Sequence, residues 1–295
     1  MEIDDIATDR MLRSVSHTLS EPTQFLEEEI ERRTDIMPSP SDVRNIMELI
    51  KKVVFPEFFT TPQFSASMKP YLINVHVNRI FILLQKQIAA ALHFCGAGEN
   101  GCRPIDKVSY ERALKAVEGL PELKRRLYTD VRAIFNSDPA VADETQVILC
   151  YPSIKAMLHF RFSHLLHELE VPLLPRIISE LAHSETGIDI NPGATIGDYF
   201  AIDHGTGVVI GETCIIGNHV TIYQGVTLGA KNFTYNDEGH PVNIPRHPII
   251  EDNVTIYSNA SVLGRITIGH DSIIGGNVWV TEDVAPYSRI VQKIA

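Results

Sequence analysis

A short polar segment in the second half of the chain carries side chains suited to acid–base chemistry. Asp203 and His204 open the sequence Asp-His-Gly-Thr-Gly, whose glycines favour a turn that displays the histidine. A neutral imidazole can remove a proton from a substrate hydroxyl group near pH 7. Asp189 precedes His204 by 15 residues, close to one repeat of the pattern described below, so its carboxylate can orient the imidazole. The sequence therefore indicates His204 and Asp189 as a candidate general base and its partner.

A second polar group, Arg246 and His247, stands directly before a proline at the end of the segment 231–245. A guanidinium group in a fixed position forms paired hydrogen bonds with a carboxylate, which makes Arg246 a candidate for binding an acidic substrate group. A histidine in a turn is often only a solvated or capping residue. Residue type and spacing alone therefore leave a catalytic and a structural interpretation open.

The composition changes near residue 185, which indicates two structural regimes in one chain. Of the 18 glycines, 4 precede this point and 14 follow it, whereas residues 185–295 contain only Leu228 and Leu263 as leucines. Leucine with mixed charge favours helices, while isoleucine, valine and glycine favour strands and turns. We therefore expect an all-helical domain at residues 1–184 and a strand domain at residues 185–295.

Helical spacing and capping signals run through the first domain. Ser39 precedes Pro40 and an acidic residue, which is typical of a helix N-terminus, and this helix is expected to continue to Val54. The segment 71–93 is apolar on more than one face, which predicts burial between other helices. Gly119 is expected to form a joint within the segment 110–136. Helices are expected at residues 24–33, 43–54, 71–93, 110–136, 153–170 and 176–183.

Aliphatic side chains recur every six residues in the second domain, with a two-residue slip at 203–207 and an insertion at 231–245. This period is typical of a parallel β-helix in which three short strands form each coil of about 18 residues. Each aliphatic side chain then points into the solenoid, and the insertion loops outwards, where repeat proteins place functional residues. The repeated positions are Ile190, Ile196, Ile202, Ile210, Ile216, Ile222, Leu228, Ile250, Ile256, Val262, Ile268, Ile274 and Val280.

The overall composition excludes several classes of protein. The 295 residues carry a net charge of -11 and the pI is about 5.5, which argues against binding to nucleic acid or to an acidic membrane surface. No apolar run approaches the roughly 18 residues of a membrane span, and the N-terminus lacks a signal-peptide pattern. The 4 cysteines are expected to be free thiols in a reducing cytosol. We therefore expect a cytoplasmic protein.

The stretch from residue 130 to about residue 283 resembles the serine acetyltransferases, which are left-handed parallel β-helix enzymes of the hexapeptide acyltransferase superfamily. The resemblance covers about half of the chain, and its helical and solenoid motifs occur together and in order. It implies an α+β fold, with an N-terminal all-helical domain followed by a left-handed parallel β-helix of hexapeptide repeats. The motifs are Asp138-Pro139-Ala140, Tyr151-Pro152-Ser153 with Arg161 and His164, 189–194, 202–213, 224–229 and Arg246-His247-Pro248.

The resemblance implies the transfer of an acetyl group from acetyl-CoA to the hydroxyl group of L-serine, which gives O-acetylserine for cysteine synthesis. His204 matches the general base of the family, and Asp189 matches the residue that orients it. Asp138 and Asp203 match the carboxylates that bind the ammonium group of serine. A zwitterionic substrate held at both ends presents its hydroxyl group in one orientation, and proximity contributes much of the rate.

The resemblance also assigns residues to the serine carboxylate and to the co-substrate. Arg246 matches the residue that pairs with the carboxylate of serine, and His247 lines the same pocket. The family needs no metal ion, and acetyl-CoA is its co-substrate. The positions that match the contacts of the family with the pantetheine arm are Gly229, Ala230, Ser258 and Gly276.

The family assembles as a homotrimer of β-helices with a catalytic cleft between neighbouring subunits, and we expect the same here. Residues 1–125 show little of the N-terminal pattern of the family, which leaves a dimer of trimers open. The C-terminal isoleucine tail with which the family binds cysteine synthase is not evident before Ala295, so that partner is also left open. Nucleic acid and membranes are not expected partners.

Other interpretations remain at this stage. Helical histidines at His159, His164, His167 and His183 have the spacing of a metal site, although each has a simpler role as a packed or capping residue. A γ-type carbonic anhydrase on the same solenoid would need two histidines four residues apart near the insertion, and none is present. An acetyltransferase for a sugar or homoserine and a noncatalytic β-helix assembly module complete the alternatives. The noncatalytic module predicts that His204→Ala leaves any measured activity and ligand binding unchanged.

Overall fold

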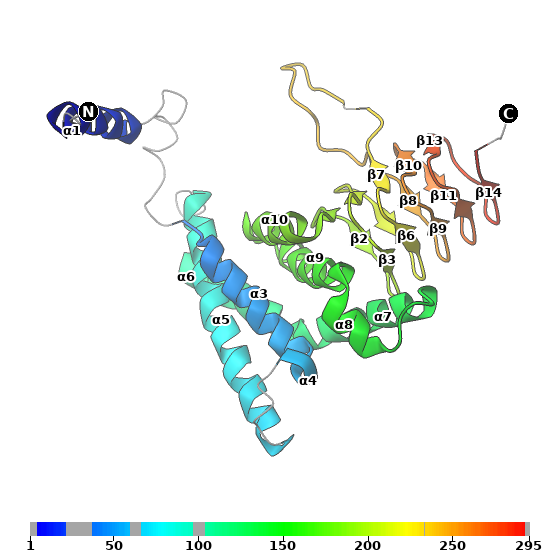
Figure 1. The fold of residues 1–295 in the computed structure, drawn as a ribbon, viewed down its shortest axis with the longest axis horizontal. Coiled ribbons are helices and arrows are strands. Elements are labelled where there is room, and N and C mark those ends of the chain that lie inside the picture. The colour runs from blue at the N-terminus through cyan, green and yellow to red at the C-terminus, as the bar shows by residue number, and fades with distance from the viewer. Residues whose placement is uncertain (1–4, 22–36, 60–65, 97–103, 233, 293–295) are drawn as a thin grey trace.

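The computed structural model describes residues 5–21, 37–59, 66–96, 104–232 and 234–292. Helices occupy the first part of the chain and short strands form a solenoid in the second part, with helices packed at one end of the solenoid (Figure 1). The expected order of an all-helical region and a parallel β-helix is confirmed. None of the helices in the described part of the chain has both the length and the apolar character that crossing a bilayer requires.

The helix α3 (Pro40–Val54) begins where its capping signal predicts. Ser39 is the N-cap, and its side chain accepts a hydrogen bond from the backbone N–H of Asp42 at 3.2 Å. The predicted helix at 24–33 lies outside the described residues. The other helices are α1 (Asp5–Ser20), α4 (Pro56–Phe59), the 3₁₀ helix η1 (Ala66–Met68), α5 (Lys69–Phe94), α6 (Ile105–Glu118), α7 (Leu120–Ser137), α8 (Glu144–Cys150), α9 (Pro152–Glu168) and α10 (Leu174–Thr186).

The helical region differs from the sequence prediction in several places, and the prediction contains no counterpart of α1, α4 or η1. Helix α5 is buried only along its second half, where Ile80 and Leu84 pack against the core, whereas Tyr71 is 63% exposed. Complete burial of the segment 71–93 is therefore wrong for the single chain, because α3 and α6 cover only part of the helix. The short helix α8 was not predicted, since its apolar period covers fewer than two turns.

Three parallel sheets form the sides of the solenoid in the described part of the chain. Parallel pairing joins each strand to the strand one coil further along the chain, as in the pair Ile190 and Ile210. Sheet A contains β1 (Asp189–Ile190), β4 (Val209–Ile210), β7 (Thr227–Gly229), β10 (Ser261–Leu263) and β13 (Trp279–Val280). Sheet B contains β2 (Thr195–Ile196), β5 (Ile215–Ile216), β8 (Ile249–Ile250) and β11 (Thr267–Ile268). Sheet C contains β3 (Ala201–Asp203), β6 (Thr221–Tyr223), β9 (Thr255–Ile256), β12 (Ile273–Ile274) and β14 (Arg289–Ile290).

The core of the solenoid consists of the aliphatic residues that the six-residue period selects. All thirteen are buried, with at most 7% of their surface exposed at Val280. Strand β14 was not predicted, because Ile290 lies ten residues after Val280 and so departs from the period. The insertion loops outwards as predicted and carries an antiparallel bridge between Tyr235 and Pro241 (Figure 1).

A buried ion pair joins the helical region to the first coil. The guanidinium group of Arg161 on α9 donates to both carboxylate oxygens of Asp130 on α7, at 2.6 and 2.7 Å. The same group donates to the backbone oxygen of Gly197 at 2.9 Å, while Asp130 accepts from the backbone N–H of Phe200 at 3.2 Å. Each buried polar group therefore has partners, and the pair positions α7 and α9 against the solenoid.

Candidate functional site

The chain turns three corners in each coil, because the strands follow one another from sheet A to sheet B to sheet C. The corner between sheets C and A is called the histidine corner, and it comprises residues 204–208, 224–226, 257–260 and 275–278. The corner between sheets A and B is called the arginine corner, and it comprises residues 211–214, 230–248 and 264–266. Both contain residues that the sequence singled out.

His204 stands directly after β3 at the histidine corner, in the left-handed region of backbone space with a φ of 57°. The next residue, Gly205, has a φ of 86°, and a Cβ atom there would lie 2.5 Å from Cδ1 of Ile188. Only glycine therefore allows the turn to close over the preceding coil. The turn exposes 71% of the His204 side chain, as predicted from the glycines around it.

Asp138 approaches this corner from the end of α7. Its Oδ1 accepts a hydrogen bond from the backbone N–H of Ala140 at 2.8 Å, and its Oδ2 accepts one from the hydroxyl group of Tyr151 at 2.5 Å. These two bonds, the Tyr151 bond above all, lower the pKa of Asp138, with a smaller contribution from His204. The same contact, together with burial, raises the pKa of Tyr151 to about 12. Asp138 is therefore an ionised carboxylate at neutral pH.

Asp203 at the end of β3 completes a group of two carboxylates beside the histidine. Its Oδ1 lies 3.9 Å from Nδ1 of His204, and 18% of its side chain is exposed. Tyr223, its partner in the next coil, has a raised pKa because of burial and because Asp203 and Asp138 lie nearby. Two negative charges and one imidazole thus face the same small region, which suits a positively charged substrate group.

Asp189 begins β1, next to the turn that carries His204. Its backbone N–H donates to the oxygen of Val208 at 2.9 Å, while its side-chain Oδ1 is buried without a hydrogen-bond partner in the described part of the chain. No hydrogen bond between Asp189 and His204 is formed among the described residues. The pairing of the two residues stays a prediction, and the buried Oδ1 is an acceptor that still lacks a donor.

The arginine corner holds Arg246 and His247 at the end of the insertion. Arg246 donates to Oε2 of Glu212 at 2.8 Å. Burial would raise the pKa of Glu212, but hydrogen bonds from Arg246 and Asn243 lower it. Burial, with the charge of Arg246, lowers the pKa of His247, whose Nδ1 accepts from the backbone N–H of Thr213 at 3.1 Å. A Cβ atom on Gly211 would lie 2.0 Å from the His247 ring, so only glycine leaves room for this imidazole.

The structure brings some of the predicted residues together and separates others. His204, Asp203 and Asp138 meet at the histidine corner, where Ser258 and Gly276 stack on later coils. Arg246, His247 and Ala230 lie at the arginine corner, and Gly229 ends β7 directly before it. The segment from Val208 to Gly211, which contains β4, connects the two corners. At about 3.3 Å per strand residue, its length is about 10 Å. One chain alone therefore does not place Arg246 opposite His204.

Three side chains at the site escaped the sequence interpretation. Tyr151 was noted only as part of a motif, although it is the hydrogen-bond partner of Asp138. Tyr223 follows Asp203 by one coil, so the repeat register is the signal that finds it. Glu212 follows a glycine in the repeat like many other turn residues, and nothing in the sequence pattern distinguishes it as the partner of Arg246.

A cluster of possible metal ligands lies beside Asp189. One donor atom each from Glu180, His183 and Asp189 lies within 4.8 Å of the others. Imidazole and carboxylate groups suit several divalent cations, but Glu180 is already paired with Arg176 and is exposed. Among the other helical histidines, His159 donates from Nδ1 to the backbone oxygen of Lys155 at 2.8 Å, as a packed residue does.

Comparison with known proteins finds similarity along most of the chain. A family model described as bacterial transferase hexapeptide (six repeats) matches residues 247–282. A plasmid serine acetyltransferase from Synechococcus elongatus is 44% identical over 261 residues, which cover 87% of this chain and 82% of that protein. Serine acetyltransferase 1 from Entamoeba histolytica, solved in complex with L-cysteine, aligns over 97% of this chain and 100% of its own, with a TM-score of 0.73 and 32% identity. Soybean serine acetyltransferase, solved with serine, aligns over 86% of this chain and 98% of its own, with a TM-score of 0.56 and 28% identity.

Proposed function

The chain belongs to the serine acetyltransferase family, and we propose that it transfers the acetyl group of acetyl-CoA to the hydroxyl group of L-serine at the histidine corner. Its solenoid is the left-handed β-helix of hexapeptide repeats that the family shares. The observation that carries the proposal is the meeting of Asp138 with Asp203 and His204 at one corner, since α7 brings Asp138 there from a distant part of the chain.

His204 is the general base in this proposal. Its exposed imidazole removes the proton of the serine hydroxyl group as the serine oxygen attacks the thioester carbonyl carbon of acetyl-CoA. The new C–O bond replaces the C–S bond, and the imidazolium returns the proton to the departing CoA sulfur. Asp189 orients the imidazole, and its partnerless buried Oδ1 supports that role, because an imidazole N–H is the kind of donor that it lacks.

Asp138 and Asp203 bind the ammonium group of serine. The lowered pKa keeps Asp138 ionised, and Tyr151 fixes its orientation through the 2.5 Å hydrogen bond. A neutral sugar offers no cation to two carboxylates, which makes a sugar acceptor the weaker candidate. Homoserine carries the same ammonium group, but its side chain is one methylene group longer. The distance between the ammonium-binding carboxylates and His204 therefore has to distinguish it from serine.

Arg246 and His247 bind the carboxylate of serine, and we propose that a second copy of the chain supplies them. The two corners lie about 10 Å apart in one chain, while a ring of three copies brings the arginine corner of one copy to the histidine corner of the next. Arg246 is already held by Glu212, so its guanidinium group is fixed before the substrate arrives. A homotrimer is therefore the smallest assembly with complete sites.

Acetyl-CoA is the proposed acetyl donor, with its pantetheine arm along Ser258 and Gly276 of one copy and Gly229 and Ala230 of the next. A Cβ atom on Gly276 would lie 3.1 Å from the backbone oxygen of Ser258, in the space between the two coils. Because glycine has no side chain, this space stays open for the pantetheine arm. The chain carries a net charge of -11, which favours backbone amides and a few local cations over a basic patch as partners of the phosphates.

Thiol release from acetyl-CoA tests the proposal with L-serine, L-homoserine and a sugar as acceptors. We expect rapid release with L-serine only, and a fall of kcat of about 100-fold to 10,000-fold in His204→Ala, the range for loss of a general base. His219→Ala, at a different corner, is the matched control and keeps its activity. Equal serine-dependent release by His204→Ala and the wild type would refute the mechanism and favour a noncatalytic module.

A further inference from the structure

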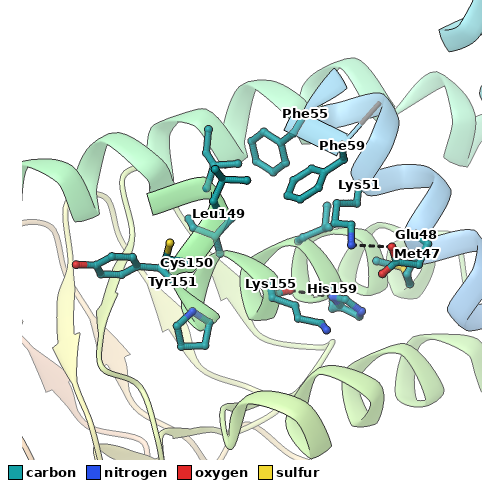
Figure 2. Close-up of a pocket in the computed structure, with 14 residues that line it drawn as sticks. Met47, Glu48, Lys51, Phe55, Phe59, Leu149, Cys150, Tyr151, Lys155 and His159 are labelled. Atoms are coloured by element: carbon teal, nitrogen blue, oxygen red, sulfur yellow. Dashed lines mark hydrogen bonds and ion pairs between the residues drawn. The ribbon is translucent and has the colours of Figure 1, made fainter. Parts of the chain in front are cut away.

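A cavity of about 230 Å³ lies between α3, α4, α8 and α9 (Figure 2). Its walls are mainly apolar, and Phe55, Ile148 and Leu158 are at most 7% exposed. Concave apolar sites with a few polar groups are the usual form of small-molecule sites. The reaction proposed above places no substrate in this cavity, and Tyr151 is the only lining residue that it uses.

One buried polar side chain in the cavity has an unused hydrogen-bonding atom. His159 is 7% exposed, and its Nδ1 donates to the backbone oxygen of Lys155 at 2.8 Å. Burial lowers the pKa of His159 to about 4, so the ring is neutral at pH 7 and its Nε2 carries no proton. This Nε2 accepts no hydrogen bond from the described residues and is not among their fully buried atoms that lack a partner, so water or a hydrogen-bond donor from a ligand can reach it.

The charged groups around the cavity already have partners. Lys51 lies 2.6 Å from the carboxylate of Glu48 and 4.9 Å from the centre of the Phe59 ring, and Lys155 is paired with Glu185. Neither lysine therefore needs an anion from solution. The lining favours a neutral ligand over a charged one.

We propose that this cavity binds a small neutral molecule with an apolar body and one O–H or N–H donor, such as a phenol or an alcohol, and that its occupancy controls the serine site. The link is the segment Cys150–Pro152, which joins α8 to α9 and forms one wall of the cavity. Figure 2 shows the Tyr151 side chain pointing away from the other lining residues. The Tyr151 hydroxyl group donates a hydrogen bond to Asp138. A ligand that displaces this wall of the cavity therefore shifts Asp138 and weakens the binding of the serine ammonium group.

The two exposed cysteines of the described chain allow a direct test of binding. Cys150 lines the cavity, whereas Cys95 lies at the end of α5, and both thiols are free. The wild-type chain is alkylated with iodoacetamide at increasing phenol concentrations, and mass spectrometry follows both cysteines. We expect phenol to slow alkylation of Cys150 at least threefold and to leave Cys95 unchanged. Equal rates at Cys150 with and without phenol would overturn the site.

Matched ligands and variants separate the hydrogen bond from the apolar contacts. Toluene has the shape of phenol without its donor, and it should need about tenfold more ligand for the same protection, because Nε2 of His159 stays unpaired. His159→Phe should abolish the preference for phenol, whereas His167→Phe, on the exposed face of the same helix, should keep it. Should His159→Phe fail to fold, Ile148→Phe narrows the cavity and must also abolish protection. Protection that persists in a folded Ile148→Phe variant contradicts the site.

The coupling rests on the proposed function and is measured separately from binding. At phenol concentrations that protect Cys150, the KM for L-serine should rise at least threefold while the KM for acetyl-CoA stays unchanged. Protection with an unchanged KM for serine would reject the control and leave the cavity as a binding site only. Because alkylation needs no turnover, a failure of the proposed enzyme activity does not affect the binding result.

Discussion

At the scale of single residues, the contact between Tyr151 and Asp138 lowers the pKa of the Asp138 carboxyl group and fixes its orientation. The tyrosine hydroxyl group donates at 2.5 Å to a carboxylate that also receives a backbone N–H. Hydrogen bonds to the ionised form lower the pKa of a carboxyl group, and here they outweigh the effect of its partial burial. The same bond keeps Oδ2 of Asp138 in a fixed position before any substrate binds.

Tyr151→Phe removes this bond and should lower the free energy of unfolding by about 1 kcal/mol at pH 7. Because the pKa of Asp138 is lowered in the folded state, the bond stabilises the protein above the pKa of an unfolded Asp, about 3.9. Its contribution disappears as the pH falls through the lowered folded pKa. Urea denaturation at pH 7 and at several values below 4 should therefore show the variant and the wild type converging. Tyr71→Phe, at a 63% exposed position, is the control with no difference at any pH.

At the scale of elements, a shared hydrophobic core and several polar contacts join the helices to the solenoid, among them those of Thr129 with Tyr199 and Ser179 with Ile190. Helix α7 brings Asp138 to the histidine corner, and its position against the first coil depends on the buried pair of Asp130 and Arg161. We propose residues 1–184 and 185–295 as two domains, with this pair at their junction. The serine site then lies at the same junction, so its geometry depends on how firmly the domains are joined.

Arg161→Met leaves the Asp130 carboxylate buried without its cation and should lower the free energy of unfolding by about 3 to 5 kcal/mol. The matched control is Arg13→Met, which breaks the exposed ion pair of Arg13 and Asp9 and should cost less than about 1 kcal/mol. Chemical denaturation of both variants measures the difference. Equal losses would mean that the buried pair does not join the domains.

At the scale of the whole molecule, we propose that a single chain is incomplete as an enzyme, because the two corners of its solenoid carry different parts of the site. His204 and Arg246 lie at different corners of the solenoid, separated by a strand of sheet A. A closed ring of identical subunits repeats the same contact between different surfaces of neighbouring chains. The proposed trimer therefore has three sites, each with one corner from each of two chains.

Mixed trimers of two inactive variants test this arrangement. His204→Ala and Arg246→Ala should each be nearly inactive, but co-expression should restore about one quarter of the wild-type activity, since a random site receives both intact corners with that frequency. Size measurement must find a trimer or a multiple of it. A monomer at micromolar concentration, or the absence of any recovery in verified mixed trimers, would contradict a shared site.

The sequence by itself determined the local features of this protein. Ser39 and Pro40 predict the start of α3, and the six-residue period selects the buried core of the solenoid, because caps and repeats depend on neighbours a few residues away. The glycines around His204 likewise predict its exposed turn. With the family motifs, the sequence also indicated the residues that carry the proposed reaction.

Only the tertiary structure decided which of these residues meet. Tyr151 reaches Asp138 because α8 turns back on α7, and Arg246 lies at a different corner from His204 because the chain turns at the end of every strand. The cavity around His159 likewise depends on four helices from distant parts of the chain. Such contacts join residues far apart in sequence, where no local pattern sets their distance, and burial then fixes their charge and hydrogen bonds.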